Sequence, residues 1–338
     1  MYLSRFNLKR RRFMFRSLVA LMAICLMTLS TLCIASCQQS VEMGVGWRRD
    51  KLNWKLKNIG LDQISGNVDS HIQFKKIELY MAYAKAKWIG SKYYVRLSAN
   101  YGTSFKGEAR EHFQLDTPLL NKDILVNTHD PIKKRSEVYD FDIATGYPLS
   151  FCYGRLNVVP LIGFSFHRQH LRVKGKKDSS SSSSYFSPIT SSNPLYGNDS
   201  NPFGKPSSDS NPIIANKLGL NVSRRTSTYR FNWYGFYLGT DIAYALDKEW
   251  TLYAELEAHC LDSCHRKRKS WTGVYFVDHY HRNRWAWGFN TNLGTTFYLS
   301  NCWYGKISLD YKWLKSHTRK DELKWESVGI NAALSHSF

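Results

Sequence analysis

The sequence has no apolar run of about 18 residues after residue 40, and a transmembrane helix needs a run of roughly that length. This absence excludes a protein that crosses a membrane with several helices. The chain also lacks any Cys-x-x-Cys pair, the ligand spacing that structural zinc sites commonly use. Seven cysteines are spread along 338 residues, and the sequence predicts neither a metal centre nor another cofactor.

Aromatic side chains, by contrast, are abundant. They make up 15% of the residues, and 11 of them are tryptophans. This content is high for a soluble domain but typical of a membrane β-barrel, which carries a girdle of aromatic residues at each membrane surface. Composition therefore favours a membrane protein built from strands.

The last segment of the chain, residues 328–338, alternates between apolar and polar or small residues. One face carries Val328, Ile330, Ala332, Leu334, His336 and Phe338. The pattern predicts a strand with one face in lipid and the other toward a polar lumen. A chain that ends on such a strand with a terminal aromatic residue resembles the C-terminal signal strand of bacterial outer-membrane barrels.

Ten segments share this period of two. They are residues 41–57, 71–88, 92–105, 137–148, 154–173, 226–246, 249–264, 283–299, 302–316 and 328–338. The connections alternate between short turns and longer stretches, which we interpret as loops at 58–70, 106–136, 174–225, 265–282 and 316–322. Short turns on one side and longer loops on the other are typical of outer-membrane barrels. The sequence therefore predicts an all-β fold, a ten-stranded antiparallel transmembrane β-barrel of the outer-membrane type.

Two strand faces need a specific assignment. In the first segment the apolar phase changes between Trp47 and Leu52, which predicts a β-bulge near Arg49. In the second segment the apolar run of alternate residues from Ile77 to Tyr83 is assigned to the lipid face, which places Glu78 in the lumen.

The N-terminus resembles an export signal. A basic segment at residues 5–16 precedes an apolar core at residues 18–32, and Ala35 and Ser36 offer cleavage sites. We expect a signal peptide at residues 1–36, a barrel domain at 37–338, and a location in the outer membrane of a Gram-negative-type bacterium. An uncleaved anchor is the alternative. Residues 34–37 also resemble a lipoprotein box, which leaves the lipidation of Cys37 open.

Charge suggests the partners. The formal net charge is +20, and a strongly basic balance favours polyanionic partners. Because the leader directs the chain out of the cytosol, we expect anionic lipid headgroups or small anions and no nucleic acid. The basic residues concentrate in the predicted outer loops, as a rim of anionic-lipid or anion-binding candidates. These are Lys133, Lys134, Arg135, Arg224, Arg225, Arg266, Lys267, Arg268 and Lys269. A set of merely solvated loop residues is the alternative.

The predicted lumen holds ionisable residues of both signs. The candidates are Arg48, Glu78, Arg96, Asp140, Asp142, Arg155, Asp241, Glu255, Glu257, His259, Lys306, Asp310 and Lys312. A ten-stranded barrel is narrow, and charges away from bulk water need partners. A paired network that fills the interior is the first interpretation. A narrow water-filled pathway and a catalytic acid pair are the alternatives.

Four cysteines certainly remain after export: Cys152, Cys260, Cys264 and Cys302. Cys260 and Cys264 are too far apart along an extended strand to be bridged, at about 13 Å. Cys152 and Cys302 fall at different predicted turns, which makes a bridge between them doubtful. Disulfides to other envelope proteins and inert thiols remain as alternatives.

The segment 174–225 is of low complexity and contains six consecutive serines, residues 179–184. Such a composition cannot bury a core. We interpret it as an extracellular loop, either simply solvated or exposed to the surroundings as an adhesin or receptor.

The first strand, residues 46–55 (GWRRDKLNWK), resembles the opening strand of omptin-like barrels. It resembles still more closely the outer-membrane proteins of chlamydia-like (protochlamydial) bacteria. The omptin resemblance implies a protease with an Asp-x-Asp pair and an Asp-x-His pair. The segment that corresponds to the first pair, Gly107 to His112, contains no Asp pair. At the position of the second pair, Asp262 and His265 have the right residue types but the wrong spacing.

The chlamydia-like resemblance implies an abundant envelope protein, in some members porin-like. We therefore expect a porin-like or structural protein with a bias toward small anions and no enzymatic activity. An omptin-like surface protease and a loop-mediated adhesin are the alternatives.

Overall fold

The computed structural model describes residues 38–61, 64–117, 122–133, 136–173, 227–269, 283–318 and 321–338. The predicted signal peptide, Cys37 and the predicted loop 174–225 lie outside the described residues and remain predictions. In the described ranges, no helix is long and apolar enough to cross a membrane.

Twelve strands and one short 3-10 helix make up the described chain. The strands are β1 (Gln38–Leu61), β2 (Ile64–Ile89), β3 (Tyr94–Thr117), β4 (Lys122–Pro131), β5 (Glu137–Gly146), β6 (Leu149–Phe151), β7 (Leu156–Val173), β8 (Ser227–Ala245), β9 (Trp250–Lys269), β10 (Asn283–Ser300), β11 (Trp303–Thr318) and β12 (Asp321–Ser337). The helix η1 (Cys152–Gly154) lies between β6 and β7.

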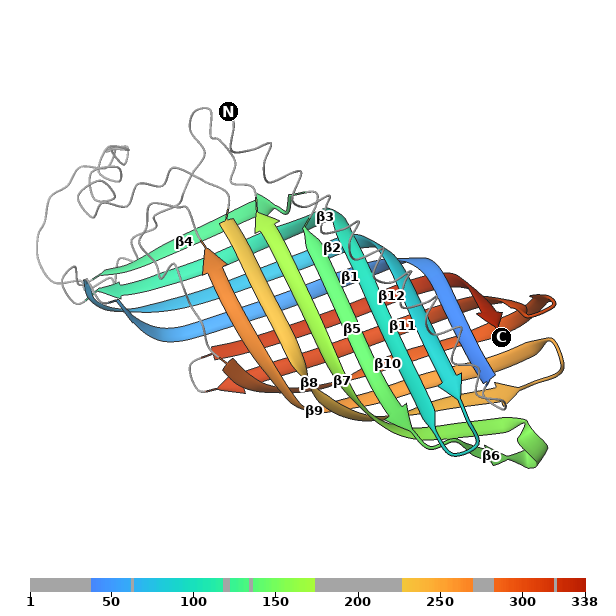
Figure 1. The fold of residues 1–338 in the computed structure, drawn as a ribbon. Helices are drawn as coiled ribbons and strands as arrows, with labels where there is room; N and C mark the ends of the chain where they lie inside the picture. The colour runs from blue at the N-terminus through green and yellow to red at the C-terminus, as the bar shows by residue number, and fades with distance from the viewer. Residues whose placement is uncertain are drawn as a thin grey trace, which may run out of the picture.

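The strands form one closed antiparallel sheet (Figure 1). Both β4 and β5 pair with β3, at successive positions along it, and β6 continues the line of β5 beside β7. These three short strands together occupy one position in the wall, so the barrel has ten strand positions. The predicted ten-stranded barrel is confirmed.

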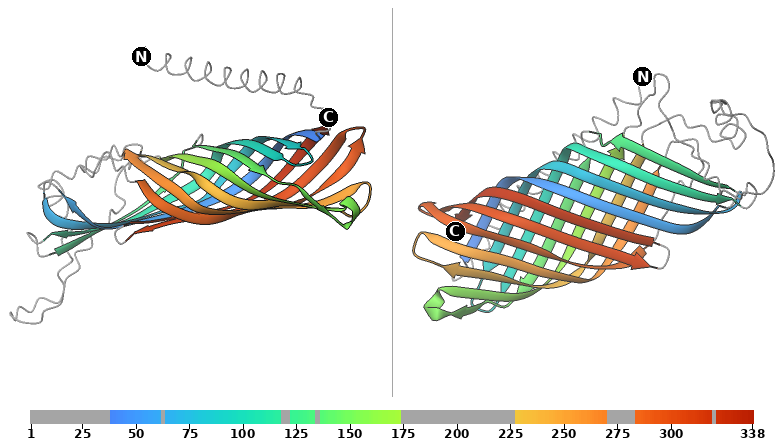
Figure 2. Two further views of the ribbon diagram at one scale, coloured as in Figure 1. Left: turned by 60° about the horizontal axis from the view of Figure 1, so that its bottom comes forward. Right: turned by 180° about the vertical axis from the view of Figure 1, so that it is seen from behind.

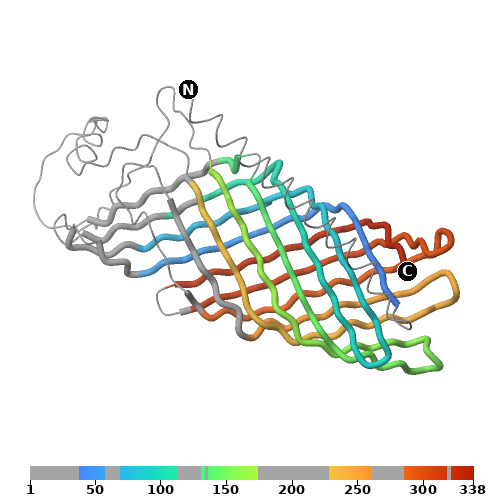
Figure 3. The backbone as a smooth tube through the Cα atoms, in the orientation of Figure 1, coloured from blue at the N-terminus to red at the C-terminus, as the bar shows by residue number. Residues whose placement is uncertain are grey.

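The first and last strands close the barrel. β1 pairs with β12 without interruption from Ser40 opposite Ser337 to Leu56 opposite Asp321, and the two lie side by side in Figure 2. The backbone N–H of Phe338 donates to the carbonyl of Gln39 at 2.9 Å. The terminal aromatic residue is therefore part of the closure, and every strand is tilted against the barrel axis (Figure 3).

Both ends of the described chain lie at the end of the barrel that carries the short turns, as predicted. The β2–β3 turn at 90–93, the β8–β9 turn at 246–249 and the β10–β11 turn at 301–302 lie at this end. We call it the short-turn end, and in outer-membrane barrels it faces the periplasm.

Where the structure describes them, the loops predicted at the other end are largely strand, which corrects the sequence interpretation for 58–70, 106–136, 265–269 and 316–322. β1 and β2 run to Leu61 and from Ile64, and β3 and β4 form a long hairpin through most of 106–131. β9 continues to Lys269, and β11 and β12 leave only residues 319–320 between them. Strands β1 to β4 project beyond the rest of the wall (Figure 1). We call the whole end of the barrel opposite the short-turn end, including the ends of the other strands there, the extension.

The outer surface explains where the membrane lies. Between the extension and the short-turn end, outward side chains such as Val45, Ile162, Leu238 and Ile330 are apolar and at least half exposed. Exposed aromatic residues border this band on both sides. On the extension side these include Tyr80, Tyr139, Trp285 and Trp287, and on the short-turn side Tyr153, Tyr244, Trp250, Trp303 and Phe338. This is the arrangement of a lipid-facing band between two aromatic girdles.

In the extension the polarity of the two faces is reversed. Leu52, Trp54, Phe74, Trp233 and Trp325 all point inward and are at most 1% exposed. The outward residues between them are polar. Fully burying a large apolar side chain contributes about 1.5–3 kcal/mol, so this inner cluster stabilises the extension outside the membrane as the core of a soluble protein does.

The same reversal explains two wrong assignments. The phase change between Trp47 and Leu52 is a change of environment and not a bulge in β1, because the β1–β12 register is unbroken there and the β1–β2 register shift between Asp50 and Leu52 comes from an extra residue on β2. The bulge lies on β2 at residues 75–76, where Lys76 has a positive φ of 50°. Beyond it Ile77 and Leu79 point inward with no exposure, whereas Tyr80 is 61% exposed. The predicted faces of the second segment are therefore exchanged.

Candidate functional site: the charged interior of the barrel

The interior at the level of the lipid-facing band is lined by ionisable side chains. Most of the predicted lumen residues are buried there, with exposures between 1% and 8%. They are Arg48, Arg96, Asp140, Asp142, Asp241, Glu255, Glu257, His259, Lys306 and Lys312. Asp310 is less buried but lines the same internal space.

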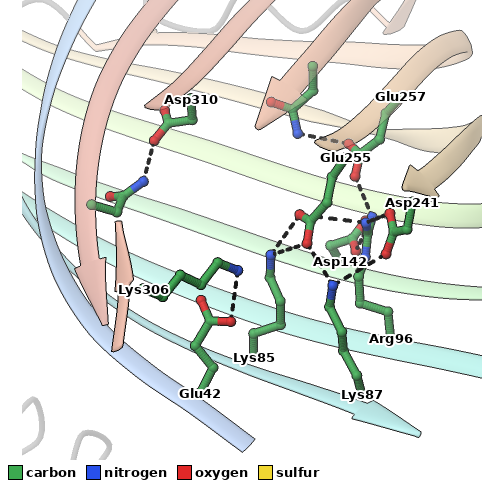
Figure 4. Close-up of polar contacts among 12 residues, drawn as sticks. Glu42, Lys85, Lys87, Arg96, Asp142, Asp241, Glu255, Glu257, Lys306 and Asp310 are labelled. Atoms are coloured by element: carbon green, nitrogen blue, oxygen red, sulfur yellow. Dashed lines mark hydrogen bonds and ion pairs between the residues drawn. The ribbon is translucent and has the colours of Figure 1, made fainter. Parts of the chain in front are cut away.

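Arg96 on β3 is the centre of the largest cluster (Figure 4). Its Nη1 donates to Asp241 on β8 at 2.6 Å, and its Nη2 donates to Glu257 on β9. The same Nη2 contacts Asp142 on β5 at 3.3 Å and the Tyr237 hydroxyl at 2.9 Å. One guanidinium therefore ties together strands from opposite parts of the wall.

Two lysines of β2 extend this cluster. Lys85 donates to both oxygens of Glu255, at 2.9 and 2.7 Å, and Lys87 donates to the same carboxylate at 2.9 Å. Lys87 also lies 3.5 Å from Asp241, and Arg96 lies 3.7 Å from Glu255. The paired charges thus form one continuous network across the interior (Figure 4).

A second cluster lies nearer the extension. Arg48 on β1 donates to Asp140 on β5 at 2.7 Å, and its Nε lies 3.0 Å from Asp50. Lys312 on β11 is 3.8 Å from Asp140, and Nδ1 of His167 on β7 is 3.2 Å from it. The Asp140 carboxylate is therefore shared by three partners from three strands.

A third group lies toward the short-turn end. Lys306 on β11 donates to Glu42 on β1 at 2.9 Å, and its ammonium group is 4.0 Å from the ring centre of Tyr253. The side chain of Asn331 donates to Asp310 at 2.5 Å. These contacts join the last two strands of the barrel to the first.

Basic and acidic residues of the interior are interleaved. The inward basic residues of the described chain are Arg48, Lys85, Lys87, Arg96, Lys306 and Lys312. The inward acidic residues at this level are Glu42, Asp50, Asp140, Asp142, Asp241, Glu255, Glu257 and Asp310. The carboxylates are in the majority, so the described interior carries no excess of positive charge.

Little space remains between these groups. They line a cavity of about 100 Å³, which is room for a few water molecules. Toward the extension, the apolar cluster around Trp54, Trp233 and Trp325 covers the polar layer. The arrangement can hold ten strand positions in a fixed register.

Two of the predicted lumen residues lie elsewhere. Glu78 points outward because of the bulge on β2, and it accepts a hydrogen bond from Arg49 at 2.8 Å on the outer surface. Arg155 lies in the exposed turn after η1, where the chain is no longer strand. The Glu78 error comes from assigning the apolar face of this stretch to lipid, and the Arg155 error comes from extending an alternating pattern into a turn.

The predicted lumen candidates omitted five polar residues of the network: the buried Glu42, Asp50, Lys85 and His167 and the partly buried Lys87. For the lysines a signal was available. From Ala82 to Trp88 the small or apolar residues at even positions alternate with Tyr83, Lys85 and Lys87, a phase opposite to the one we assigned.

The predicted basic rim is described only in part. Lys133 is half-buried next to β5, and residues 266–269 belong to the end of strand β9 and not to a loop. Lys134, Arg135, Arg224 and Arg225 lie outside the described residues, as do the side chains of 266–269. The rim therefore stays a prediction.

The positions that the omptin resemblance singled out are also strand. Residues 107–112 lie within β3, and Asp262 and His265 lie within β9. The side chains of Asp262 and His265 lie outside the described part. An aspartate–histidine contact does occur between Asp140 and His167, but it is buried under the apolar cluster with Arg48 bound to the same carboxylate. No group of residues in the described ranges has the geometry of a metal site.

Three of the cysteines have described side chains, and all three are exposed free thiols. Cys152 and Cys302 lie at the short-turn end, both with a positive φ, of 53° and 66°. Cys260 points outward from β9 in the lipid-facing band. The side chain of Cys264 lies outside the described residues.

Comparison with known families and structures agrees with this architecture. The family model described as Pom, Protochlamydia outer membrane protein, matches residues 42–338. No curated protein sequence matches the chain. Among solved structures, the outer membrane protease OmpT of Escherichia coli has a TM-score of 0.52 at 10% sequence identity, covering 89% of this chain and 97% of OmpT.

Two other barrels are less similar. The attachment invasion locus protein Ail of Yersinia pestis has a TM-score of 0.25 at 9% identity, covering 88% of this chain and 99% of Ail. The outer membrane protein OprG of Pseudomonas aeruginosa has a TM-score of 0.25 at 9% identity, covering 90% and 96%. At these identities the likeness to OmpT concerns the fold and not the activity.

Proposed function

Since the chain belongs to the Protochlamydia outer membrane protein family, we propose that this outer-membrane β-barrel has a structural role in the cell envelope and is not a constitutively open pore. The observation that carries the proposal is the interior network centred on Arg96, in which buried charges of both signs pair across the lumen. Buried charges remain in place only when partners compensate their lost hydration, so opening the interior would expose unpaired charges.

The same network weighs against a preference for small anions. Carboxylates outnumber basic groups in the described interior, and a narrow path lined by an excess of negative charge attracts cations. We also propose no catalytic role for the Asp140–His167 contact, because it is enclosed in the barrel and the Asp140 carboxylate also binds Arg48 and Lys312. Neither a protease nor an adhesin is supported by a specific contact among the described residues.

Conductance in planar bilayers tests the closed interior. The purified full-length protein is expected to produce no stepwise conductance, because the paired charges and the apolar cluster fill the barrel. An open porin added to the same bilayers is the positive control for insertion. Reproducible steps from the protein, and above all anion-selective steps, would contradict the proposal.

We further propose that the cysteines at the short-turn end link the barrel to other envelope proteins. Cys152 and Cys302 are exposed and project from turns on the side that faces the periplasm, an oxidising compartment in which disulfides form. Cys260, which faces lipid, is the matched control. Its thiol is exposed on the lipid-facing wall and not at a turn.

Non-reducing electrophoresis of envelope fractions tests this link. The wild-type chain and a Cys260→Ser variant are expected to migrate in cross-linked species that reducing agent dissolves. A Cys152→Ser/Cys302→Ser variant is expected to migrate as a monomer. A wild-type protein that is monomeric without reducing agent would rule out the cross-link.

A further inference from the structure

One nitrogen of His167 on β7 faces a hydrogen-bond donor and an acceptor at the same distance. Its Nδ1 lies 3.2 Å from the ammonium nitrogen of Lys312 on β11 and 3.2 Å from Oδ1 of Asp140 on β5. A neutral imidazole nitrogen either accepts through its lone pair or donates its N–H. Nδ1 therefore binds one of these two partners fully and not both.

The other ring nitrogen of His167 has no such contact. Its Nε2 forms no hydrogen bond with any described residue, and the residue is 4% exposed. A protonated ring carries an N–H on both nitrogens. Protonation would therefore bury the N–H of Nε2 without an acceptor and set the N–H of Nδ1 against the Lys312 ammonium. Because unpaired buried polar groups and charges are costly, the closed interior accommodates the neutral ring and not the cation.

The charges around His167 do not offset a further positive charge. Asp140 is the one carboxylate of the described residues that contacts the ring, and it already binds Arg48 and faces Lys312. The other ionisable groups of this part of the interior belong to three strands. They are Asp50 on β1, Glu257 and His259 on β9, and Asp310 on β11.

His259 is placed differently, although its ring centre lies only 6.0 Å from that of His167. Its Nε2 lies 3.4 Å from Glu257, and its Nδ1 lies 3.2 Å from the hydroxyl oxygen of Ser165. A carboxylate and a hydroxyl oxygen can each accept an N–H. A protonated His259 therefore has an acceptor for each nitrogen, and of the two histidines His167 is the one that the closed arrangement cannot hold as a cation.

The groups disturbed by this protonation support Trp325, which covers the polar layer. The ring centre of His167 lies 5.8 Å from that of Trp325, and the Lys312 ammonium lies over the same ring at 5.3 Å. Two like charges in contact repel strongly where little water surrounds them, so protonation pushes Lys312 and the His167 ring apart. Movement of either group withdraws a contact from Trp325. Water from the extension would then reach the polar layer and hydrate the added charge.

From these contacts we propose that protonation of His167 opens the barrel to small ions by moving Lys312 and Trp325 out of their closed positions. The inference rests on the proposed function, because it takes the interior to be closed at neutral pH. It adds an open state that acid populates. The wall itself stays intact in this state, since the hydrogen bonds between neighbouring strands do not involve these side chains.

Conductance at two pH values tests the proposal. In planar bilayers the purified full-length protein is expected to give no steps at about pH 7.5 and stepwise conductance at about pH 5, on either side of the range in which histidine titrates. Because one proton is bound, the ratio of open to closed time is expected to rise up to about tenfold for each unit that the pH falls. An open porin controls for insertion at each pH.

The two pH values separate the two proposals. Steps at about pH 7.5 would contradict the closed interior and therefore the proposed function. Absence of steps at both pH values would leave the closed interior standing and overturn the acid response alone.

Two glutamine substitutions on β7 assign the response to one residue. The amide of His167→Gln does not titrate, and it offers an oxygen to Lys312 and an N–H to Asp140 at once, so this variant is expected to give no steps at either pH. His170→Gln is the matched control. His170 lies 3.9 Å from Glu137, on the other face of β7 from His167, and its variant is expected to respond to acid as the wild type does.

Folding of both variants is checked by their heat-induced gel shift. Acid-induced steps from His167→Gln would show that another group senses the acid and would overturn the assignment. Loss of the acid response in His170→Gln would overturn it as well, because that substitution leaves the contacts of His167 in place.

Discussion

Replacing Arg96 with alanine is expected to lower the free energy of unfolding by about 3–5 kcal/mol, the usual cost of removing one partner from a buried ion pair. The side chain is 1% exposed and contacts Asp142, Asp241 and Glu257. Without the guanidinium these carboxylates would face one another inside the barrel with most of the positive charge that offsets their repulsion removed, and Asp241 would keep only the more distant Lys87 as a cationic partner, at 3.5 Å. Urea titration of the protein folded in detergent micelles or lipid vesicles measures the effect.

An exposed arginine on the neighbouring surface is the matched control. The side chain of Arg49 is 51% exposed and forms a single ion pair with Glu78 at 2.8 Å. Arg49→Ala is expected to change the free energy of unfolding by about 1 kcal/mol or less, as surface ion pairs do. Equal effects of the two substitutions would refute the view that the interior network holds the barrel together.

A compensated variant separates charge from packing. Arg96→Met combined with Asp241→Asn and Glu257→Gln keeps the interior filled while removing the two carboxylate charges that lie nearest to Arg96. Because buried ion pairs can be replaced by uncharged groups at little cost, this triple variant is expected to regain much of the stability that Arg96→Ala loses. No recovery would indicate that the shape of Arg96, and not its charge, is what the barrel requires.

The pairing itself could not be read from the sequence. Alternation shows correctly that Arg96 and Glu257 each face the interior, because each strand keeps its own period. It contains no information on which strands face one another across the lumen. Arg96 on β3 meets Glu257 on β9 only because closing the sheet through β1 and β12 brings these walls together.

The extension shows a different limit of sequence interpretation. Between Arg48 and Leu52 on β1 the inward residues change from charged to apolar without a break in the strand. A rule that apolar faces are lipid faces holds inside the membrane and fails beyond it, where water surrounds the barrel. This rule also hid the strands in the described parts of 58–70, 106–131 and 265–269, which we predicted as loops.

Trp325 joins the two layers of the interior, and its replacement by alanine is the second substitution with a large expected effect. The ring has no exposure and lies 6.3 Å from the Trp233 ring centre on the apolar side. On the charged side, Arg48 and Lys312 lie over it at 5.6 and 5.3 Å. Removing a buried tryptophan costs about 3–5 kcal/mol through lost contacts and the cavity that remains.

Outward Trp285, which is 73% exposed, provides the comparison. Trp285→Ala leaves no internal cavity and is expected to lower the free energy of unfolding by less than half as much in the same urea titration. Because Trp325 also covers the polar layer, its alanine variant is the one expected to admit ions, giving small conductance steps where the wild type gives none. If Trp325→Ala matched Trp285→Ala in its free energy of unfolding and also gave no conductance steps, the apolar cluster would not be what closes the barrel. The polar network alone would then have to explain both the stability of the barrel and its closed interior.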